Sequence, residues 1–411
     1  MSIIDDLNKK QIWEEFLEYK LNKNLLSPKE QSYIKEYIKK ESYLKICNEI
    51  IKGEYEFSPP TKHLINKIDN SKKRVVYTFN DDETMVLKLI SYLLYKYDDK
   101  LSPNCYSFRK NLGVKQAIRQ LVKHNTINQL YCYKVDIKNY FNSIDIELLL
   151  PKLKQVINGD DRLYIFLANL LKSNKAIFCG QEVLENKGIM AGVPISSFLA
   201  NVFLKDIDEY YYKNNIIYAR YSDDIIFFCE KEQLDYRVKE LENNINQHNL
   251  ELNENKRVIT KPGGKISFLG FSYQNGVIDL SDITKNKIKG KIRRAARKIR
   301  RWMLKKQANP ERAIKVMTKK FNNKFYGFQT GKQLTWIRWF FPVINTTQGL
   351  KEIDYYMQQY LRYIVTGKHN KKNYEKVGYD LLKRCNYKSL VNQYYCLKKT
   401  NKIILMAKCK C

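Results

Sequence analysis

Two short apolar runs with an acidic pair between them dominate the hydrophobic pattern of the chain. Residues 216–221 and 225–229 are largely aromatic or β-branched and too short for helices, so they predict buried strands. Ser222, Asp223 and Asp224 lie between them and predict a tight hairpin turn. Two neighbouring carboxylates on a buried hairpin repel each other and lose hydration, and a divalent cation would remove both penalties. An ordinary turn remains the alternative, since Asp is common in turns.

A third carboxylate follows another predicted strand. Residues 130–136 alternate towards a strand that ends in Asp136, and a helix is predicted over 146–155. A single strand-end Asp is usually a cap or a turn residue. Three acids on two neighbouring strands would instead form a two-metal cluster that clamps the attacking and leaving oxygens of a phosphoryl transfer.

Helical spacing of apolar residues predicts two or three helices in residues 1–50, and one helix each over 83–97 and 232–249. Residues 266–271 and 273–280 predict the two strands of a hairpin closed at Asn-Gly, a strong turn signal.

Three cations, Lys72, Lys73 and Arg74, stand directly before a β-prone run that ends at residue 79. Such a strand could hold a triphosphate, or it could be a solvated sheet edge. Residues 188–204 form a loop of small residues that leads into a helix. Its Gly and Ala residues permit close backbone approach to a ligand, and Ser196 and Ser197 can cap the helix.

The formal net charge of +31 is concentrated near the carboxyl end. Residues 281–411 hold 33 Lys and Arg against 6 Asp and Glu, a charge of +27, and the first 280 residues carry only +4. After Asp282 the apolar residues keep helical spacing among many cations, which predicts an amphipathic helix with a basic outer face. This region is typical of a polyanion-binding arm. Codon bias towards lysine is the alternative, but it does not account for the arginines clustered between Arg293 and Arg301.

The remaining composition indicates a folded cytoplasmic protein. We expect no secretory signal, because the amino terminus is acidic, and no membrane span, because no apolar run is long enough. The nine scattered cysteines fit a reducing compartment and give no metal-site spacing.

Taken in order, these segments resemble the reverse transcriptase family over roughly residues 60–280. The resemblance rests on Asp136 with Phe141, the loop and helix at 188–204, Tyr221-Ser-Asp-Asp224, the segment 252–256 and Phe268-Leu-Gly-Phe271, which look like palm motifs. Residues 72–79 and Tyr106-Ser-Phe-Arg109 look like the fingers blocks.

Within the family the chain looks most like the bacterial defence-associated enzymes formerly called the "unknown group", with retron and group II intron enzymes as neighbours. Residues 363–374 and 387–395 resemble its class 2 members. Ala191 stands where the family usually has a glutamine that contacts the incoming nucleotide. No second acidic cluster for an RNase H domain and no cysteine-histidine endonuclease motif is seen.

The resemblance implies an α+β right-hand polymerase: a helical extension at 1–60, fingers and palm with an antiparallel palm sheet at 61–280, and a basic helical thumb at 281–411. It implies RNA-directed DNA synthesis with two Mg²⁺ ions, for which Mn²⁺ can substitute. The expected partners are a structured non-coding RNA template, deoxynucleoside triphosphates and the cDNA product, and the expected setting is anti-phage defence.

The resemblance also implies a role for each site residue. Asp136, Asp223 and the Ile137 carbonyl would bind the metals, with support from Asp224. Lys73, Arg74 and Lys256 would hold the triphosphate or the leaving group, and Phe141 would exclude a 2′-hydroxyl. Ala191 and Gly192 would lie at the nucleotide and the template base. The segment Phe268, Leu269, Gly270 and Phe271 would grip the primer, and the thumb arginines would contact nucleic acid: Arg293, Arg294, Arg297 and Arg301.

Two other functions stay open on the sequence. The chain could be a non-catalytic RNA-binding protein on a polymerase scaffold, although such a protein has no need of three acids. It could also be a polymerase that needs no template or starts from a protein hydroxyl, for which the 31 tyrosines leave room.

Overall fold

The chain folds as two compact units. The computed structural model describes residues 2–66, 73–185, 188–327 and 335–408. Unit 1 comprises Met1–Lys23 and Lys29–Gly264, and unit 2 comprises Asn24–Pro28 and Lys265–Cys411. The division at Gly264 differs from the boundary expected at residue 280, because the strands between these positions pack with the helices that follow them. None of the described helices combines the length and the apolar character needed to cross a membrane.

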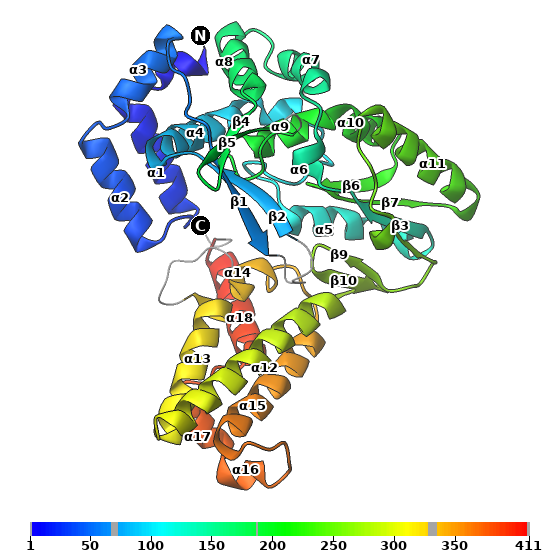
Figure 1. Cartoon of the computed structure of the whole chain (residues 1–411). Coiled ribbons are helices and arrows are strands. Elements are labelled where there is room, and N and C mark those ends of the chain that lie inside the picture. Colours follow the sequence, from blue (N-terminus) through cyan, green and yellow to red (C-terminus); the bar gives the residue numbers. More distant parts are fainter. Residues whose placement is uncertain (1, 67–72, 186–187, 328–334, 409–411) are drawn as a thin grey trace. The chain divides into compact units, whose positions relative to one another are not determined.

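Unit 1 is a mixture of helices and two sheets (Figure 1). Its first half contains η1 (Ile3–Asp6), α1 (Lys10–Asn22), α2 (Pro28–Lys39), α3 (Leu44–Lys52), β1 (Thr61–Asn66), β2 (Lys73–Thr78), α4 (Asp81–Leu93), η2 (Leu94–Lys100), α5 (Val114–Lys123), η3 (Asn125–Asn128), β3 (Tyr131–Asp136) and α6 (Tyr140–Ser143). Its second half contains α7 (Ile146–Val156), α8 (Asp161–Lys172), β4 (Lys175–Phe178), β5 (Gln181–Leu184), α9 (Ser196–Phe203), α10 (Lys205–Lys213), β6 (Ile217–Tyr221), β7 (Asp224–Cys229), α11 (Lys231–Gln247), η4 (Glu254–Lys256) and β8 (Val258–Thr260).

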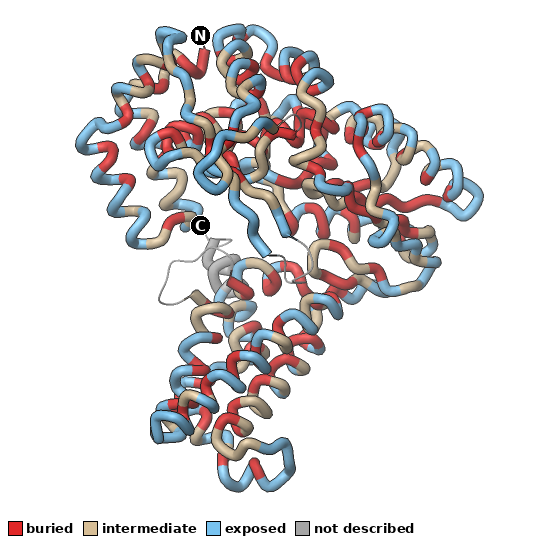
Figure 2. The backbone as a smooth tube through the Cα atoms, viewed as in Figure 1, coloured by how far each residue is buried: buried red, intermediate tan, exposed pale blue. Residues whose placement is uncertain are grey.

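The central sheet of unit 1 has the order β6-β7-β3-β8, and all its neighbours are antiparallel. Strand β7 lies between two partners, and Ile225–Cys229 are all buried, as a strand covered on both faces requires. Helix α11 packs against β3 and β7, while α5 and α10 contact β6. Figure 2 shows the buried residues that gather along these strands. The strands predicted at 130–136, 216–221 and 225–229 are thereby confirmed.

The second sheet of unit 1 has the order β2-β1-β4-β5. Strands β1 and β2 pair over their whole described length, and β1 meets β4 in parallel only at Thr61 and Ile177. The predicted helices of the first 50 residues form α1, α2 and α3. Trp13 and Phe16 on α1 are fully buried, and Trp13 stacks on Tyr43 at 4.6 Å between ring centroids. Because α1 and α3 also pack on α4, these helices belong to the core of unit 1.

The loop before α9 is held by close backbone approach on both sides. Gly188 adopts φ +91°, and a Cβ there would lie 2.6 Å from the Cα of Asn142. Gly192 adopts φ +105°, and a Cβ there would lie 2.5 Å from Cγ1 of Val76 on β2. The loop therefore joins the segment after β3 to strand β2, and only glycine fits at either contact.

The two serines predicted to cap α9 do not do so, and that prediction was wrong. Ile195 occupies the N-cap position without a side-chain cap. The Ser196 hydroxyl instead donates to the carbonyls of Ile189 and Met190 at 2.5 and 3.0 Å. These loop carbonyls turn inward and need a donor, which Ser196 supplies.

Unit 2 combines a small sheet with a helical bundle. Its elements are β9 (Ile266–Phe268), β10 (Phe271–Gln274), β11 (Val277–Leu280), α12 (Asp282–Lys305), α13 (Pro310–Tyr326), α14 (Trp336–Trp339), α15 (Gln348–Thr366), α16 (Asn373–Lys376), α17 (Tyr379–Arg384) and α18 (Leu390–Lys408). Helix α12 packs between α13 and α15, and α15 also contacts α18. The predicted amphipathic helix is confirmed in α12, whose buried stripe includes Ile288, Ile292 and Ile299.

The strand prediction at residues 266–280 is corrected in part. The Asn275-Gly276 turn is present, with φ +47° and +81°. However, Leu269 and Gly270 also have positive φ angles, +50° and +88°, so the run predicted as one strand is two strands joined by a second tight turn. Glycine at Gly270 permits this second turn.

An ion pair buried in unit 1 joins α10 to the β6–β7 hairpin. The Arg220 side chain is fully buried, and its Nε and Nη2 donate to both Asp208 oxygens at 2.5–3.1 Å. Nη1 donates to the carbonyl of Ser222 at 3.1 Å. Arg220 thus holds the hairpin turn through the Ser222 carbonyl, and Asp208 balances its buried charge.

We expect Asp208→Asn to lower the free energy of unfolding by about 3–5 kcal/mol, because it leaves a buried guanidinium without its counter-charge. Urea unfolding measures this change. Glu251→Gln is the control, since the Lys138–Glu251 pair is 58% and 71% exposed and should contribute little to stability. Equal costs for the two variants would contradict the structural role of the buried pair.

We expect Gly188→Ala to destabilise unit 1 by about 1–3 kcal/mol more than Gly180→Ala. Gly180 has φ +82° and nothing within 4 Å of an added Cβ, so its variant reports only backbone strain of about 1–2 kcal/mol. The difference between the two unfolding free energies measures the clash with Asn142. No difference would mean that the loop can move away from that segment at no cost.

Candidate nucleotidyl-transfer site

Three carboxylates meet at one end of the central sheet. Asp136 ends β3 and lies directly opposite Asp224, the first residue of β7. Ser222 and Asp223 form the two-residue turn before it, with Ser222 at φ +61°. The Ile137 amide donates to the Asp223 carbonyl at 2.9 Å, so the backbone fixes the turn against the end of β3. The predicted acids on neighbouring strands are therefore brought together, with Asp224 in the strand and not in the turn.

Asp136 has one oxygen engaged and one free of protein partners. The residue is 5% exposed. Its Oδ2 accepts from Lys256 Nζ at 2.5 Å. Its Oδ1 is buried and has no hydrogen-bond partner in the described part of the chain. An unpaired buried carboxylate oxygen is costly, and a bound cation would satisfy it.

The acid pair on the hairpin resists ionisation. Burial, and then the charge of Asp136, raises the pKa of Asp223 above its usual value. Burial, followed by the charges of Asp223 and Asp136, raises the pKa of Asp224 to about 6. Since both pKa values are raised in the folded chain, ionisation of these groups lowers the stability of the metal-free fold as the pH rises from about 4 through 6.

Three cations moderate this repulsion: Lys134 and Lys256 act on Asp224, and Lys256 and Arg74 act on Asp223. Burial alone would lower the pKa of Lys256, but its hydrogen bond to Asp136 and the three acidic charges raise it overall. Arg74 on β2 acts on the Asp223 charge and partly offsets the rise in the pKa of that carboxyl. Lys73 and Arg74 are both exposed at the start of β2. Lys72, the third predicted cation, lies outside the described residues.

The donor set fits a hard divalent cation in kind, since carboxylate and carbonyl oxygens are the ligands that Mg²⁺ takes. The free Asp136 oxygen and the raised pKa values of Asp223 and Asp224 point to the same charge deficit. Within residues 2–408, as far as described, no three acidic, His or Cys side chains are gathered closely enough to form a finished coordination shell. The carboxylates would therefore have to turn towards an ion.

The loop before α9 is bonded through its backbone to Phe141 and to strand β2. The Ile189 amide donates to the Phe141 carbonyl at 2.9 Å, and the Ala191 carbonyl accepts from the Tyr77 amide at 2.8 Å. The loop thus connects the segment of Phe141 to strand β2. Gly192 is exposed beside β2 and packs so closely on Val76 and Tyr77 that a side chain would not fit.

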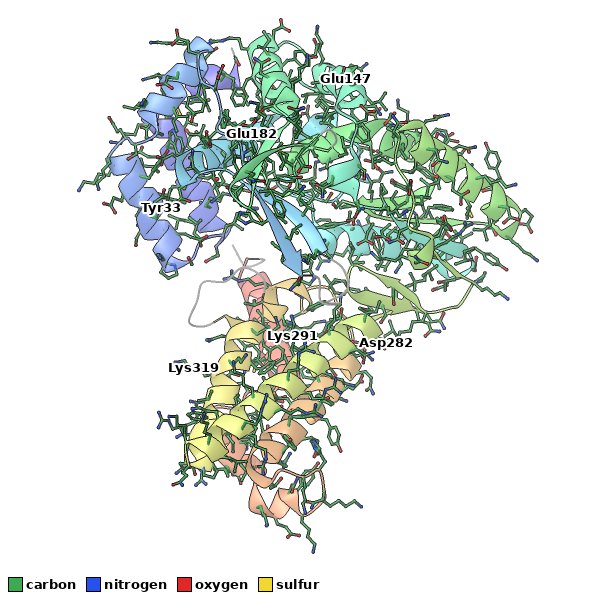
Figure 3. The ribbon with its side chains drawn as sticks, in the orientation of Figure 1. Tyr33, Glu147, Glu182, Asp282, Lys291 and Lys319 are labelled. Atoms are coloured by element: carbon green, nitrogen blue, oxygen red, sulfur yellow. The ribbon has the colours of Figure 1, made fainter. Side chains whose placement is uncertain are left out.

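The other predicted site residues lie in unit 2. Phe268 and Phe271 are buried in the core, where Phe271 packs on Phe340 at 5.2 Å, and half-buried Leu269 and Gly270 form the turn between them. The four thumb arginines are exposed on α12. Figure 3 labels two lysines of this unit, Lys291 on α12 and Lys319 on α13, which are both exposed.

Sequence reasoning missed two groups around the site. One is the Arg220–Asp208 pair beneath the turn, for which a charged residue inside the apolar run 216–221 was the available signal. The other is Phe108, whose ring lies 6.2 Å from Phe141 and 6.5 Å from Tyr221 between centroids. Its loop was identified as a motif, but no local pattern indicates the contact.

Comparison with known proteins gives one match over much of the chain and one over a shorter part. The family model for reverse transcriptase (RNA-dependent DNA polymerase) matches residues 65–273, just over half of the chain. The retron Ec83 reverse transcriptase of Escherichia coli is 32% identical over 109 residues, which cover 24% of this chain and 32% of that protein. The match thus spans about a third of the length of this relative.

Solved structures similar to the chain include yeast telomerases. Apo telomerase from Candida tropicalis has a TM-score of 0.48 at 12% identity and covers 80% of this chain and 59% of that one. Candida albicans telomerase with a fragment of telomeric RNA has a TM-score of 0.42 at 13% identity and covers 85% and 68%. The family assignment rests on the sequence match to residues 65–273, within which all three acids lie. The chain belongs to the reverse transcriptase (RNA-dependent DNA polymerase) family.

Proposed function

We propose that the chain is an RNA-directed DNA polymerase that copies an associated structured non-coding RNA into cDNA by two-metal nucleotidyl transfer. The observation that carries the proposal is the register of Asp136 opposite Asp224, with Asp223 in the adjoining turn and one Asp136 oxygen buried without a hydrogen-bond partner among the described residues. A protein that only binds RNA gains nothing from this costly arrangement.

Asp136, Asp223 and the carbonyl of Ile137 would hold the metals, with Asp224 supporting them. When bound, two Mg²⁺ ions, or Mn²⁺ in their place, would activate a 3′-hydroxyl and neutralise the triphosphate and the leaving pyrophosphate. Lys256 already touches Asp136 and carries a raised pKa, so it stays protonated and can hold or protonate the leaving group.

The nucleotide would lie between β2 and the acid cluster. Arg74 acts electrostatically on Asp223, so a triphosphate would lie between the Arg74 guanidinium and the metals at Asp223. Lys73 precedes Arg74 on β2 and would bind the same phosphates. Phe141 would lie under the sugar and exclude a 2′-hydroxyl. The backbone around Ala191 and Gly192 would take the place of the usual glutamine contact and support the template base.

Unit 2 would bind the nucleic acid. Arg293, Arg294, Arg297 and Arg301 are exposed on α12, while Arg300 is used within the unit and donates to the carbonyls of Ile364 and Val365. The turn at Phe268-Leu-Gly-Phe271 would grip the primer. The motifs at 363–374 and 387–395 support a place among defence-associated enzymes, acting in the bacterial cytoplasm against phage.

We expect Asp223→Ala to reduce primer extension on an RNA template with Mg²⁺ by about 10³-fold or more, since metal stabilisation of the transition state amounts to several kcal/mol. Thermal stability without metal should hold or rise slightly above pH 6, because the variant loses a buried charge that Asp136 repels. Mg²⁺ should raise the melting temperature of the wild type and not of the variant.

Asp235→Ala, an exposed change of the same kind on α11, is the matched control and should keep full extension. Wild-type extension rates in Asp223→Ala would exclude this metal site. For the unmutated chain, an absence of synthesis would favour the non-catalytic RNA-binding protein, and extension that ignores the template would favour the template-independent polymerase.

We expect neutralisation of the four α12 arginines to glutamine to weaken RNA binding and to reduce the slope of log K against log salt by about 3. Each lost phosphate contact contributes roughly 0.7–0.9 to that slope. The measurement is binding to the RNA that co-purifies with the protein, at several salt concentrations. Extension on a saturating preformed primer-template should suffer less than RNA capture.

The matched control replaces four exposed lysines of the amino-terminal helical region, Lys29, Lys35, Lys39 and Lys45, with glutamine. It removes the same charge and should leave the slope unchanged. If this control loses binding and the arginine variant does not, the RNA is recognised before residue 60. If the RNA that co-purifies with the wild type is a random sample of cellular RNA, unit 2 binds nucleic acid only as a general electrostatic clamp.

A further inference from the structure

Three aromatic rings meet beside the acid cluster. Phe108 lies edge-to-face with Phe141, with 6.2 Å between centroids and an interplanar angle of 85°. It also lies 6.5 Å from Tyr221, the residue before the catalytic turn. Phe141 has Tyr140 as its other aromatic neighbour, at 5.7 Å. Phe108 therefore links the ring proposed to face the sugar to the end of strand β6, which leads into the turn of Asp223.

The backbone of Phe108 shows that its position is imposed. Its φ is +56°, in the left-handed region that bulky side chains rarely adopt. The side chain is 40% exposed, so full burial of the ring does not compensate for this conformation. A bulky, exposed ring held in an unfavourable backbone state points to a role at the site.

The residues on either side of Phe108 hold it in place. Ser107 Oγ accepts from the Ser222 amide of the catalytic turn at 2.8 Å and donates to Asn201 Oδ1 at 3.1 Å. Arg109 donates to the carbonyls of Ser102 and Cys105 at 3.0 and 3.2 Å. The loop is thereby fixed to the turn itself, and the ring of Phe108 has a defined place against Phe141.

We propose that Phe108 is a positioning residue for sugar discrimination: its ring holds Phe141 in the orientation that excludes the 2′-hydroxyl of a ribonucleotide. This inference rests on the proposed function, in which Phe141 selects deoxynucleotides. The Phe108 ring acts through Phe141, so removal of Phe108 frees the Phe141 ring to rotate away and admits the larger sugar. The chemistry at the acids needs no contact from Phe108.

The test uses Phe108→Gly, because glycine adopts φ +56° without strain and removes the whole side chain with its ring. The full-length chain extends a DNA primer annealed to one RNA template, with dCTP or CTP as the nucleotide. The ratio of kcat/KM for dCTP to that for CTP should fall about 3- to 10-fold, the equivalent of one aromatic contact. We expect kcat for dCTP to stay unchanged.

The double-mutant cycle with Phe141→Val separates positioning from general packing. Phe141→Val should lower the ratio most. The double variant should have the same ratio as Phe141→Val alone, because the Phe141 ring that Phe108 positions is then absent. Phe108→Tyr should keep the wild-type ratio, since the ring remains and its hydroxyl can reach solvent. Asn215→Gly, at another left-handed and exposed position with φ +54°, is the control for added backbone freedom and should change nothing.

The outcomes distinguish this inference from the proposed function. If the wild type makes no templated DNA, the proposed function fails. If Phe141→Val leaves the ratio unchanged, the proposed role of Phe141 in excluding the 2′-hydroxyl fails. If Phe141→Val lowers the ratio and Phe108→Gly does not, only the role of Phe108 is overturned. It is also overturned if Phe108→Gly raises both KM values equally, as loss of a template or primer contact would do, or if its effect adds to that of Phe141→Val.

Discussion

The buried pair between Arg220 and Asp208 is the interaction on which the rest of unit 1 depends. Through its side chain Arg220 holds the Ser222 carbonyl of the turn, and through its backbone it accepts from the Tyr106 amide at 2.9 Å. One residue therefore fixes α10, the acidic hairpin and the loop of Phe108 relative to each other. Buried charges cost desolvation, which only well-formed hydrogen bonds offset. Here Asp208 accepts from Tyr218 as well as from Arg220, so its oxygens are satisfied.

This fixed base explains how the chain tolerates three acids at one strand end. Carboxylates on a mobile loop would move apart and relieve their repulsion. Asp224 is a strand residue opposite Asp136, and the Ile137 amide holds the turn, so the charges cannot separate by backbone movement. Burial, and then the charges of the neighbouring acids, raises the pKa values of Asp223 and Asp224. Lys256 offsets part of the repulsion between the carboxylates through its bond to Asp136. The remaining negative charge at the site still needs a cation.

The sequence predicted those parts of the fold that follow from short periods. The apolar runs of β6 and β7, the alternation of β3 and the stripe of α12 are local patterns, and each element forms where it was expected. The acid cluster followed because Asp136 ends one strand and Asp223 and Asp224 adjoin another. What local patterns could not predict are contacts between distant segments. Ser107 and Ser222 are 115 residues apart, and the spacing of either one carries no sign of the other.

The errors have the same origin. Ser196 was predicted as a helix cap because an N-cap side chain bonds to a backbone amide two or three residues further on, which is a local pattern. In the structure its hydroxyl donates instead to a carbonyl of the loop before α9. The segment Phe268-Leu-Gly-Phe271 looked like one strand because both rings are apolar. Its turn became visible only in the positive φ angles of Leu269 and Gly270. In both places the tertiary environment overrides the local preference of the residues.

The distribution of charge in unit 2 argues against codon bias as its cause. Two of its acids have partners inside the unit: Glu352 pairs with Lys285 and Lys289, and Asp354 accepts from Tyr387, Ser389 and two backbone amides near the start of α18. Residues 281–411 carry a net charge of +27, and their exposed cations repel each other. Bias towards lysine codons would add cations throughout the chain, yet the first 280 residues are nearly balanced at +4. Binding of a polyanion, which would neutralise the cations of residues 281–411, explains why the excess positive charge is confined to that region.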